Sequence, residues 1–230
     1  MQSDTLLEQV RLLRAQGRAP KQIARTLGIR PAEATRLVRA AAAQAPVAEP
    51  ALVGCWLSPT WSTGLGLGDH PDWPTDENPA VGTDGLVSVL VARRHKFDKV
   101  TVCGYLTDVY CLGVKNALGP EPMDDLGLKH FVQAFFDGYH DDPIEAPIEL
   151  ARELVFGSVD YARSLGFEPH PDFEDTKSWL GTWTGPSTIT FGKDGKPFYI
   201  SGPRDNPAPI IRKLENSVGE GNYDYIAIPV

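Results

Sequence analysis

Apolar residues in the first forty positions recur at the three- and four-residue steps of amphipathic helices, with charged residues between them. Gly17 and Gly28 stand where two of these patterns stop, and Pro20 and Pro31 stand where two of them start. Proline suits the first turn of a helix because its missing N–H would have no partner there, and glycine suits the residue after the last turn. The pattern therefore predicts three short helices. The predicted inward-facing residues are Leu6, Leu7, Val10, Leu13, Ala15, Ile23, Ala24, Leu27, Ile29, Ala34, Leu37 and Val38.

A run of alanine and proline separates these helices from the rest of the chain. Residues 40–50 read AAAAQAPVAEP, in which the alanines extend the third helix and the prolines then end regular structure. We therefore expect a helical domain over residues 1–43, a short linker over residues 44–51 and a second domain over residues 52–230.

The second domain begins with patterns that are typical of strands. Residues 53–57 form a short apolar run that predicts a first strand. Residues 86–93 and 100–112 are rich in β-branched and aromatic side chains and flank a polar turn at residues 95–98. Two such runs around a short turn predict a long antiparallel hairpin.

Helical periodicity then returns before the chain ends in further strand patterns. Residues 126–139 and 147–165 carry apolar side chains at helical steps, which predicts two helices. The tail is predicted to hold a second hairpin (residues 188–191 and 198–201), a helix (residues 210–218) and a final strand (residues 223–228). Strands, then helices, then strands indicate an α+β domain with antiparallel hairpins, preceded by the small all-α domain.

A long loop over residues 58–83 links the first two predicted strands. It contains the sequence GLGLG, but Pro71 and Pro74 follow, so no helix begins there to face a bound phosphate. Trp61 and Trp73 lie in this loop, and we expect them to hold it against the domain. Under an alternative hypothesis, the chain is a non-catalytic protein-interaction adaptor and the tryptophan loop is its contact surface.

Charge divides the chain at the same place as the alanine–proline run. Of 22 basic and 30 acidic residues, eight basic and three acidic fall in residues 1–45, which leaves 14 and 27 elsewhere and gives net charges of +5 and −13. The basic part is suited to a polyanion, and the acidic part is repelled by one.

The pattern I-A-x-x-L-G-I, followed by a short helix, resembles the helix-turn-helix of homeodomain-like, resolvase-like and sigma-factor-like bacterial proteins. In those families the second helix of the motif enters the major groove. The resemblance implies that double-stranded DNA binds through residues 20–40. Because a single module with this charge binds weakly, specific binding implies a homodimer. Carried over by position, the DNA-facing residues are Arg30, Pro31, Ala32, Glu33, Thr35, Arg36 and Arg39.

The second domain carries a resemblance of its own. The segments DVYCLGVKNA, ARELVFGSVDYARSLGFEPHPDF and ITFGKDGKPFYISGPRDNP resemble an uncharacterised bacterial domain family. This resemblance covers most of residues 85–228 and implies a self-standing domain, but it brings no activity with it. The helix-turn-helix resemblance and the division of charge together give the main hypothesis. It is a DNA-binding transcriptional regulator whose acidic domain dimerises or senses a signal.

A further hypothesis is a metal-dependent hydrolase positioned by the N-terminal module. Carboxylate and imidazole groups cluster at Asp137–Asp142 and again at His170–Asp175, and such groups hold divalent ions in hydrolases. The candidate metal ligands are His140, Asp141, His170 and Asp172. The candidate catalytic residues are Asp108, Lys115, His170 and Asp172. The sequence names no cofactor.

Each of these candidates also has a structural interpretation. Asp108 lies inside an apolar run, where its carboxylate must be exposed, paired or functional, and a salt link to Lys115 or a turn cap would satisfy it. The His170-Pro171-Asp172 sequence is also a common turn and helix cap. Whether these residues are catalytic or structural is left open by the sequence.

The cysteines and the hydropathy pattern bear on location. Cys55, Cys103 and Cys111 have no metal-site spacing and suit buried free thiols in a reducing compartment. No apolar run approaches the roughly 18 residues of a membrane span, and the N-terminus lacks the apolar core of a secretion signal. The sequence therefore favours a cytoplasmic protein with no membrane partner.

Overall fold

The computed structural model describes residues 2–44, 49–68, 70, 72–74, 85–94, 98–202 and 205–227. The chain divides into two compact units, Met1–Ala48 and Glu49–Val230. In its described residues the first unit holds α1 (Gln2–Ala15), α2 (Pro20–Leu27) and α3 (Pro31–Gln44). The core of this unit contains Val10, Ile23, Ala24 and Ala34, which are buried, and Leu7, Leu13, Leu27, Ile29, Leu37 and Val38, which pack against them. All three helices therefore contribute to one small apolar core. The side chain of Ala15 lies outside the described part.

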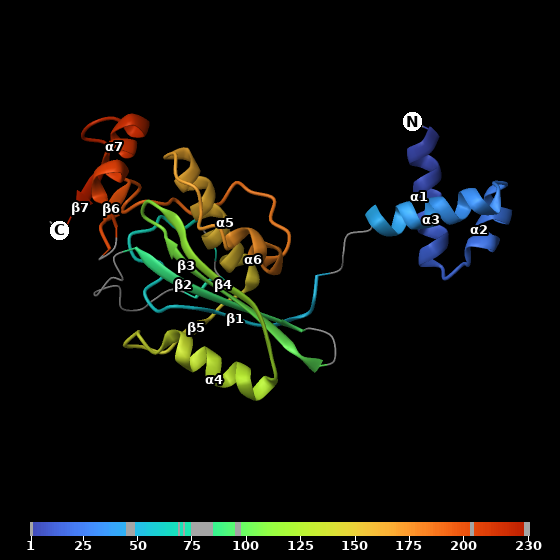
Figure 1. Cartoon of the computed structure of the whole chain (residues 1–230), viewed down its shortest axis with the longest axis horizontal. Helices are drawn as coiled ribbons and strands as arrows, with labels where there is room; N and C mark the ends of the chain where they lie inside the picture. Colours follow the sequence, from blue (N-terminus) through green and yellow to red (C-terminus); the bar gives the residue numbers. More distant parts are fainter. Residues whose placement is uncertain are drawn as a thin grey trace. The chain divides into compact units, whose positions relative to one another are not determined.

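The second unit is built on a five-stranded antiparallel sheet, which confirms the α+β class (Figure 1). The strand order is β4-β3-β2-β1-β5. The strands are β1 (Leu52–Leu57), β2 (Leu86–Arg94), β3 (Val100–Asp108), β4 (Gly113–Met123) and β5 (Ile144–Glu145). The pairing of β2 with β3 confirms the predicted hairpin, although residues 95–97 of its turn lie outside the described part.

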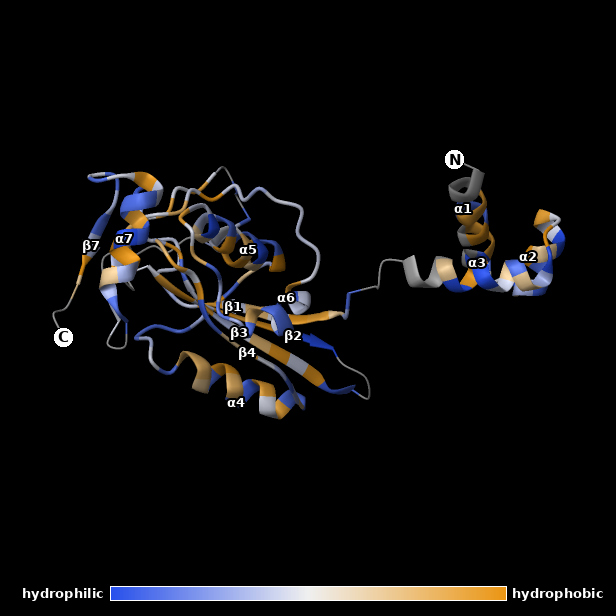
Figure 2. Ribbon diagram, turned by 45° about the horizontal axis from the view of Figure 1, so that its top comes forward, coloured by the Kyte–Doolittle hydropathy of each residue, from blue (hydrophilic) through white to orange (hydrophobic). Residues whose placement is uncertain are grey.

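Helices cover both faces of this sheet. The described helices of the second unit are α4 (Asp125–Phe136), α5 (Ile148–Ser164), α6 (Phe173–Leu180) and α7 (Pro207–Val218). α4 lies on one face, and α5 and α6 lie on the other (Figure 1). The core on the α5 side includes Leu57, Tyr105 and Leu154, whereas the α4 side includes Leu90 and Val102. Figure 2 shows hydrophobic colouring along the strands between these layers.

The tryptophans of the long loop point into the second unit. Trp61 is fully buried, Trp73 is nearly so, and their rings meet edge to face at 6.3 Å. The Trp61 indole N–H donates to the carbonyl of Pro74 at 3.0 Å. The expectation that tryptophans hold the loop is confirmed for the described residues, and residues 69, 71 and 75–83 lie outside them. Because both rings are buried, neither offers the contact surface that the adaptor hypothesis needs.

Two predictions about strands are wrong. The apolar run over residues 100–112 is not one strand, because β3 ends at Asp108 and β4 begins at Gly113. The predicted second hairpin is absent from the described tail: β6 (Phe198–Ile200) pairs in parallel with β7 (Asp224–Ile226). Residue 190 instead forms an isolated bridge with Gly66. β4, β5 and α6 have no counterpart among the predicted elements. Residue 228 of the predicted last strand lies outside the described part. Among the described residues, no helix is long and apolar enough to cross a membrane.

Candidate functional site

Three local features fix the two ends of α2 and the turn that leads from it into α3. The side-chain carbonyl of Gln22 accepts from the N–H of Ala19 at 2.9 Å and secures the start of α2. Gly28 ends α2 with φ 66°, a left-handed conformation that favours glycine. The N–H of Ile29 then reaches back to the carbonyl of Ala24 at 3.0 Å. α3 therefore leaves the turn in a direction fixed by backbone hydrogen bonds, with Ile29 packed in the corner.

The face of α3 turned away from the core carries the predicted DNA-facing residues. Ala34 is buried and Leu37 and Val38 pack into the core, whereas Thr35, Arg36 and Arg39 face outward. Six of the seven predicted residues are exposed, and Glu33 is half-buried; the exposed ones are Arg30, Pro31, Ala32, Thr35, Arg36 and Arg39. Among the described residues, none of these three arginines forms an ion pair, so their guanidinium donors face solvent.

A shallow hollow lies where α2 meets the start of α3. It has a volume of about 430 Å³, and its lining residues are Lys21, Ala24, Arg25, Gly28, Ile29 and Pro31. Lys21 and Arg25 are exposed and supply two cations at its edge. Arg30 precedes α3, and an arginine side chain has no acceptor with which to cap the first helical N–H groups. The side chains that line the hollow therefore present two cations and no carboxylate to an anion.

Asp108 lies at the end of β3, and its side chain caps the following turn. It is buried, and one carboxylate oxygen accepts from the N–H groups of Tyr110 at 3.0 Å and Cys111 at 2.9 Å. Burial raises the pKa of Asp108 to about 6, against the lowering effects of Lys115 and the backbone N–H groups. Of the interpretations that the sequence left open, the turn cap is the one that the geometry matches.

Lys115 forms its ion pair with a residue that the sequence analysis missed. Its ammonium lies 3.2 Å from the carboxylate of Asp205, which also accepts from the Tyr199 hydroxyl at 3.3 Å and the Gly202 N–H at 2.9 Å. Burial favours the neutral acid, but the Gly202 N–H and the Lys115 ammonium outweigh it and hold the pKa of Asp205 below its ordinary value. The only sequence signal was an aspartate in a Pro/Gly-rich segment, which does not identify a partner 90 positions away.

His170 and Asp172 lie together at the start of α6. The Nδ1 atom of His170 accepts from the Asp172 N–H at 3.4 Å and lies 3.7 Å from its carboxylate. The backbone N–H of His170 donates to the carbonyl of Val114 at 2.8 Å, which places it beside the strand that carries Lys115. Both side chains are exposed, so this pair forms a surface turn that precedes α6.

His140 and Asp141 lie in the exposed turn between α4 and β5. Neither this cluster nor the one at His170 assembles a ligand set: in the part of the chain that the structure describes, no three His, Cys, Asp or Glu side chains are placed to hold a metal ion. The hydrolase hypothesis therefore finds no donor set among these residues.

The three cysteines are free and buried. Burial raises the pKa of Cys55 and Cys103 to about 12 and raises the pKa of Cys111 further. All three are therefore neutral thiols at neutral pH, whereas the thiolate is the nucleophile and metal ligand.

Arg93 is a buried cation in β2, where the sequence predicted only a strand position. Its guanidinium donates to the carbonyls of Trp179 at 2.6 Å, Pro50 at 2.7 Å and Leu180 at 3.0 Å, and to the carboxylate of Glu49 at 3.0 Å. Glu49 also pairs with Arg152 at 2.6 Å. The Thr182 N–H and the two guanidinium groups hold the pKa of Glu49 below its ordinary value. This network fastens the first residues of the second unit to the sheet and to α5.

Comparisons with protein-family models, with curated proteins and with solved structures found no match to this chain.

Proposed function

We propose that the chain is a DNA-binding regulator in which α1–α3 form a helix-turn-helix head. The observation that carries this proposal is the exposure of Arg36 and Arg39 on the outward face of α3 and of Arg30 just before it, with no ion-pair partner for any of the three among the described residues. Side chains at positions 36 and 39 lie one helical turn apart and share a face. Arginine forks match phosphate oxygens and the O6 and N7 acceptors of guanine.

The turn surface gives the proposed interface a second set of contacts. If α3 lies in the major groove, the cations Lys21 and Arg25 at the edge of the α2–α3 hollow are placed to meet the adjoining phosphates. Thr35 contributes less, because its hydroxyl already donates to the carbonyl of Pro31 at 3.0 Å. In this arrangement arginines supply most of the affinity, and the binding depends strongly on salt.

The acidic second unit has a different part in the proposal. Its net charge of −13 over the residues beyond position 45 is repelled by DNA, so contact is confined to the head. We propose a homodimer, because one head with a net charge of +5 binds weakly and two linked heads bind with a higher effective affinity. The three buried free thiols support a reducing, cytoplasmic location.

The proposal is tested by the affinity of the full chain for a random-sequence duplex at roughly 50 mM salt, where electrostatic binding is strong. Arg36→Ala plus Arg39→Ala is expected to weaken binding by about a hundredfold, since each arginine–phosphate or arginine–base contact contributes roughly tenfold. The matched control is Arg163→Ala plus Arg212→Ala, which removes the same charge from the second unit.

The control double variant is expected to bind DNA as the unaltered chain does. Equal losses in both double variants would show that net charge alone matters. Unchanged binding by the Arg36/Arg39 variant would remove α3 from the interface. Both outcomes contradict the proposal.

A further inference from the structure

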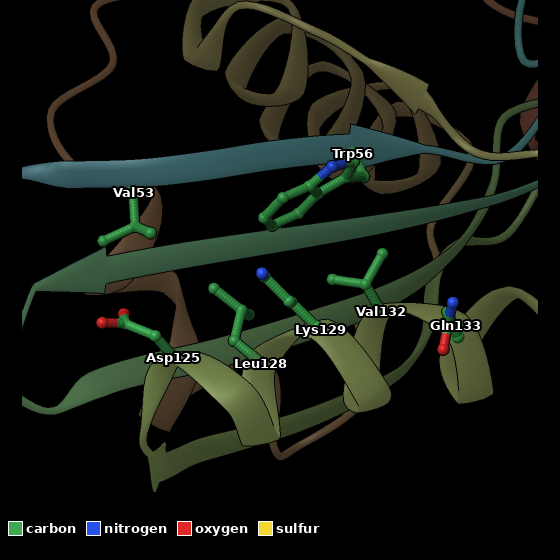
Figure 3. A pocket seen from close by; sticks show the side chains of 7 residues that line it. All are labelled: Val53, Trp56, Asp125, Leu128, Lys129, Val132 and Gln133. Carbon is green, nitrogen blue, oxygen red and sulfur yellow. The ribbon is translucent and has the colours of Figure 1, made fainter.

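A groove opens on the α4 side of the sheet in the second unit (Figure 3). It has a volume of about 470 Å³, within the range of small-molecule sites. Its lining residues are Val53 and Trp56 from β1, and Asp125, Leu128, Lys129, Val132 and Gln133 from α4. α4 packs against the central strands, and the groove follows the strip of sheet between this helix and β1.

A β-bulge places Val53 and Trp56 on the same face. The pairing of β1 with β2 shifts register between Leu52 and Gly54, so Val53 is the extra residue. Beyond the bulge, Cys55 and Leu57 point into the core under α5, while Val53 and Trp56 both pack on the α4 side. Without the bulge, strict alternation would send residues 53 and 56 to opposite faces.

Gly54 allows the Trp56 ring to lie along the strand. A Cβ atom at position 54 would overlap the six-membered ring of the Trp56 indole, so only glycine leaves room for the ring there. The ring is half-buried, with part of it exposed to the groove. Among the described residues its N–H has no acceptor. Trp56 therefore offers a planar apolar surface and an unused donor, next to the aliphatic side chains of Val53 and Val132.

The charges at the edge of the groove do not balance. Asp125 is already paired with Arg94 at 2.9 Å. Lys129 forms no ion pair with any described residue, and Figure 3 shows it extending from α4 toward the strand that carries Trp56. An occupant that places a negative group at Lys129 gains a charge-assisted hydrogen bond that no protein group already makes.

We propose that this groove binds a small planar organic anion, with its ring against the Trp56 indole and its acidic group at Lys129. The groove is apolar along its length and cationic at one edge, which matches an aromatic ring that carries a carboxylate or sulfonate. The proposal concerns the second unit alone and does not depend on DNA binding by the first.

The test uses two probes that share one ring system. 1-Anilinonaphthalene-8-sulfonate carries a negative charge, and N-phenyl-1-naphthylamine lacks it. Fluorescence titration of the full chain is expected to show saturable binding of one sulfonate per chain, with the neutral probe bound at least roughly tenfold more weakly because it cannot pair with Lys129. Equal affinities for the two probes, or no saturable binding of the sulfonate, would overturn the proposal.

Variants locate the site. Lys129→Gln is expected to weaken sulfonate binding about tenfold. Lys177→Gln, which removes a lysine from α6 on the opposite face, is expected to leave it unchanged. Val132→Trp fills the groove at a half-exposed position and is expected to abolish binding; urea unfolding checks that it is folded. Equal effects of the two lysine variants, or full binding by Val132→Trp, would contradict the assignment. So would sedimentation showing a dimer that Val132→Trp dissociates, because the occupant would then be a second copy.

Discussion

The two units of this chain treat their charged side chains in opposite ways. In the first unit Arg36 and Arg39 are exposed, and among the described residues they have no ion-pair partner. In the second unit Arg93 is buried and donates to three carbonyls and a carboxylate. A guanidinium that donates four hydrogen bonds within its own chain holds that chain together, whereas one whose donors face solvent remains open to an external anion. Whether an arginine is structural or available for binding therefore depends on whether its donors already have partners within the chain.

The acidic residues show the same contrast. Asp108 is buried, and its carboxylate caps a turn in the second unit through two backbone N–H groups. Glu33 in the first unit lies half-buried on the helix that carries the exposed arginines. Asp108 contributes to the stability of the second unit, whereas Glu33 contributes to the electrostatic potential at the surface of α3.

The largest effect is expected from breaking the buried arginine network. Arg93→Met leaves Glu49 without one of its two cations and removes a donor from three carbonyls, of which that of Leu180 keeps the Arg152 Nε–H. We therefore expect the free energy of unfolding of the second unit to fall by about 3–5 kcal/mol. All five tryptophans follow position 49, so urea unfolding followed by tryptophan fluorescence reports on this unit alone. Arg212→Met, an exposed control, should change stability by less than about 0.5 kcal/mol. Similar stabilities for the two variants would show that burial of Arg93 has no energetic consequence.

A smaller effect, opposite in sign, is expected at Asp108. Its pKa rises from 3.8 to about 6 on folding, so between these values the folded chain holds more protons than the unfolded chain. Stability from this group therefore decreases as pH rises through that window and stays lower above it. Asp108→Asn keeps an acceptor for the turn and removes the charge. We expect it to stabilise the second unit by roughly 2–3 kcal/mol at pH 7.5.

At low pH the same substitution is expected to have little effect, because Asp108 is then protonated in both states. Urea unfolding at pH 7.5 and near pH 3, below the ordinary pKa of 3.8, measures the difference. A variant less stable than the unaltered chain at pH 7.5 would mean that the turn needs an ionised carboxylate, and that the burial cost assigned to Asp108 is wrong.

The smallest effect is expected at Glu33. Glu33→Gln removes one negative charge from α3 while keeping the shape of the side chain. We expect affinity for a random-sequence duplex to rise about two- to threefold at low salt, and the gain to vanish as salt screens it. Fluorescence anisotropy with a labelled duplex measures this change, and Glu168→Gln, on the second unit, is the matched control. If Glu33→Gln instead bound the duplex more weakly, the result would indicate that Glu33 contacts a base.

Local patterns anticipated some elements of the fold and missed others for identifiable reasons. The β2–β3 hairpin followed from two apolar runs on either side of a short turn. β4 was missed because Gly113, Gly119 and two prolines interrupt its alternation. β6 was paired wrongly because its partner, β7, lies beyond α7, and no local turn signals a parallel pairing. Short, strongly periodic segments can be predicted from the sequence, but the pairing of strands that lie far apart in the sequence cannot.

The candidate sites differ in the same way: some of their residues could be predicted from local sequence, and others could not. The DNA-facing residues came from the helix-turn-helix resemblance, and helical spacing agrees with it because Ala34, Leu37 and Val38 are the inward positions of α3. The partner of Lys115 could not be predicted, because Asp205 reaches it only through the folding of the tail. The groove at Trp56 depends on a one-residue bulge, which no period in the sequence records.

Hydrogen–deuterium exchange of the full chain, with and without a random-sequence duplex at low salt, shows directly which residues contact DNA. We expect DNA to slow exchange within residues 20–40, at α2 and α3, and to leave exchange in the sheet and helices of the second unit unchanged. Slower exchange in the second unit with no change at residues 20–40 would contradict the proposal, as would no change anywhere at a DNA concentration that saturates binding.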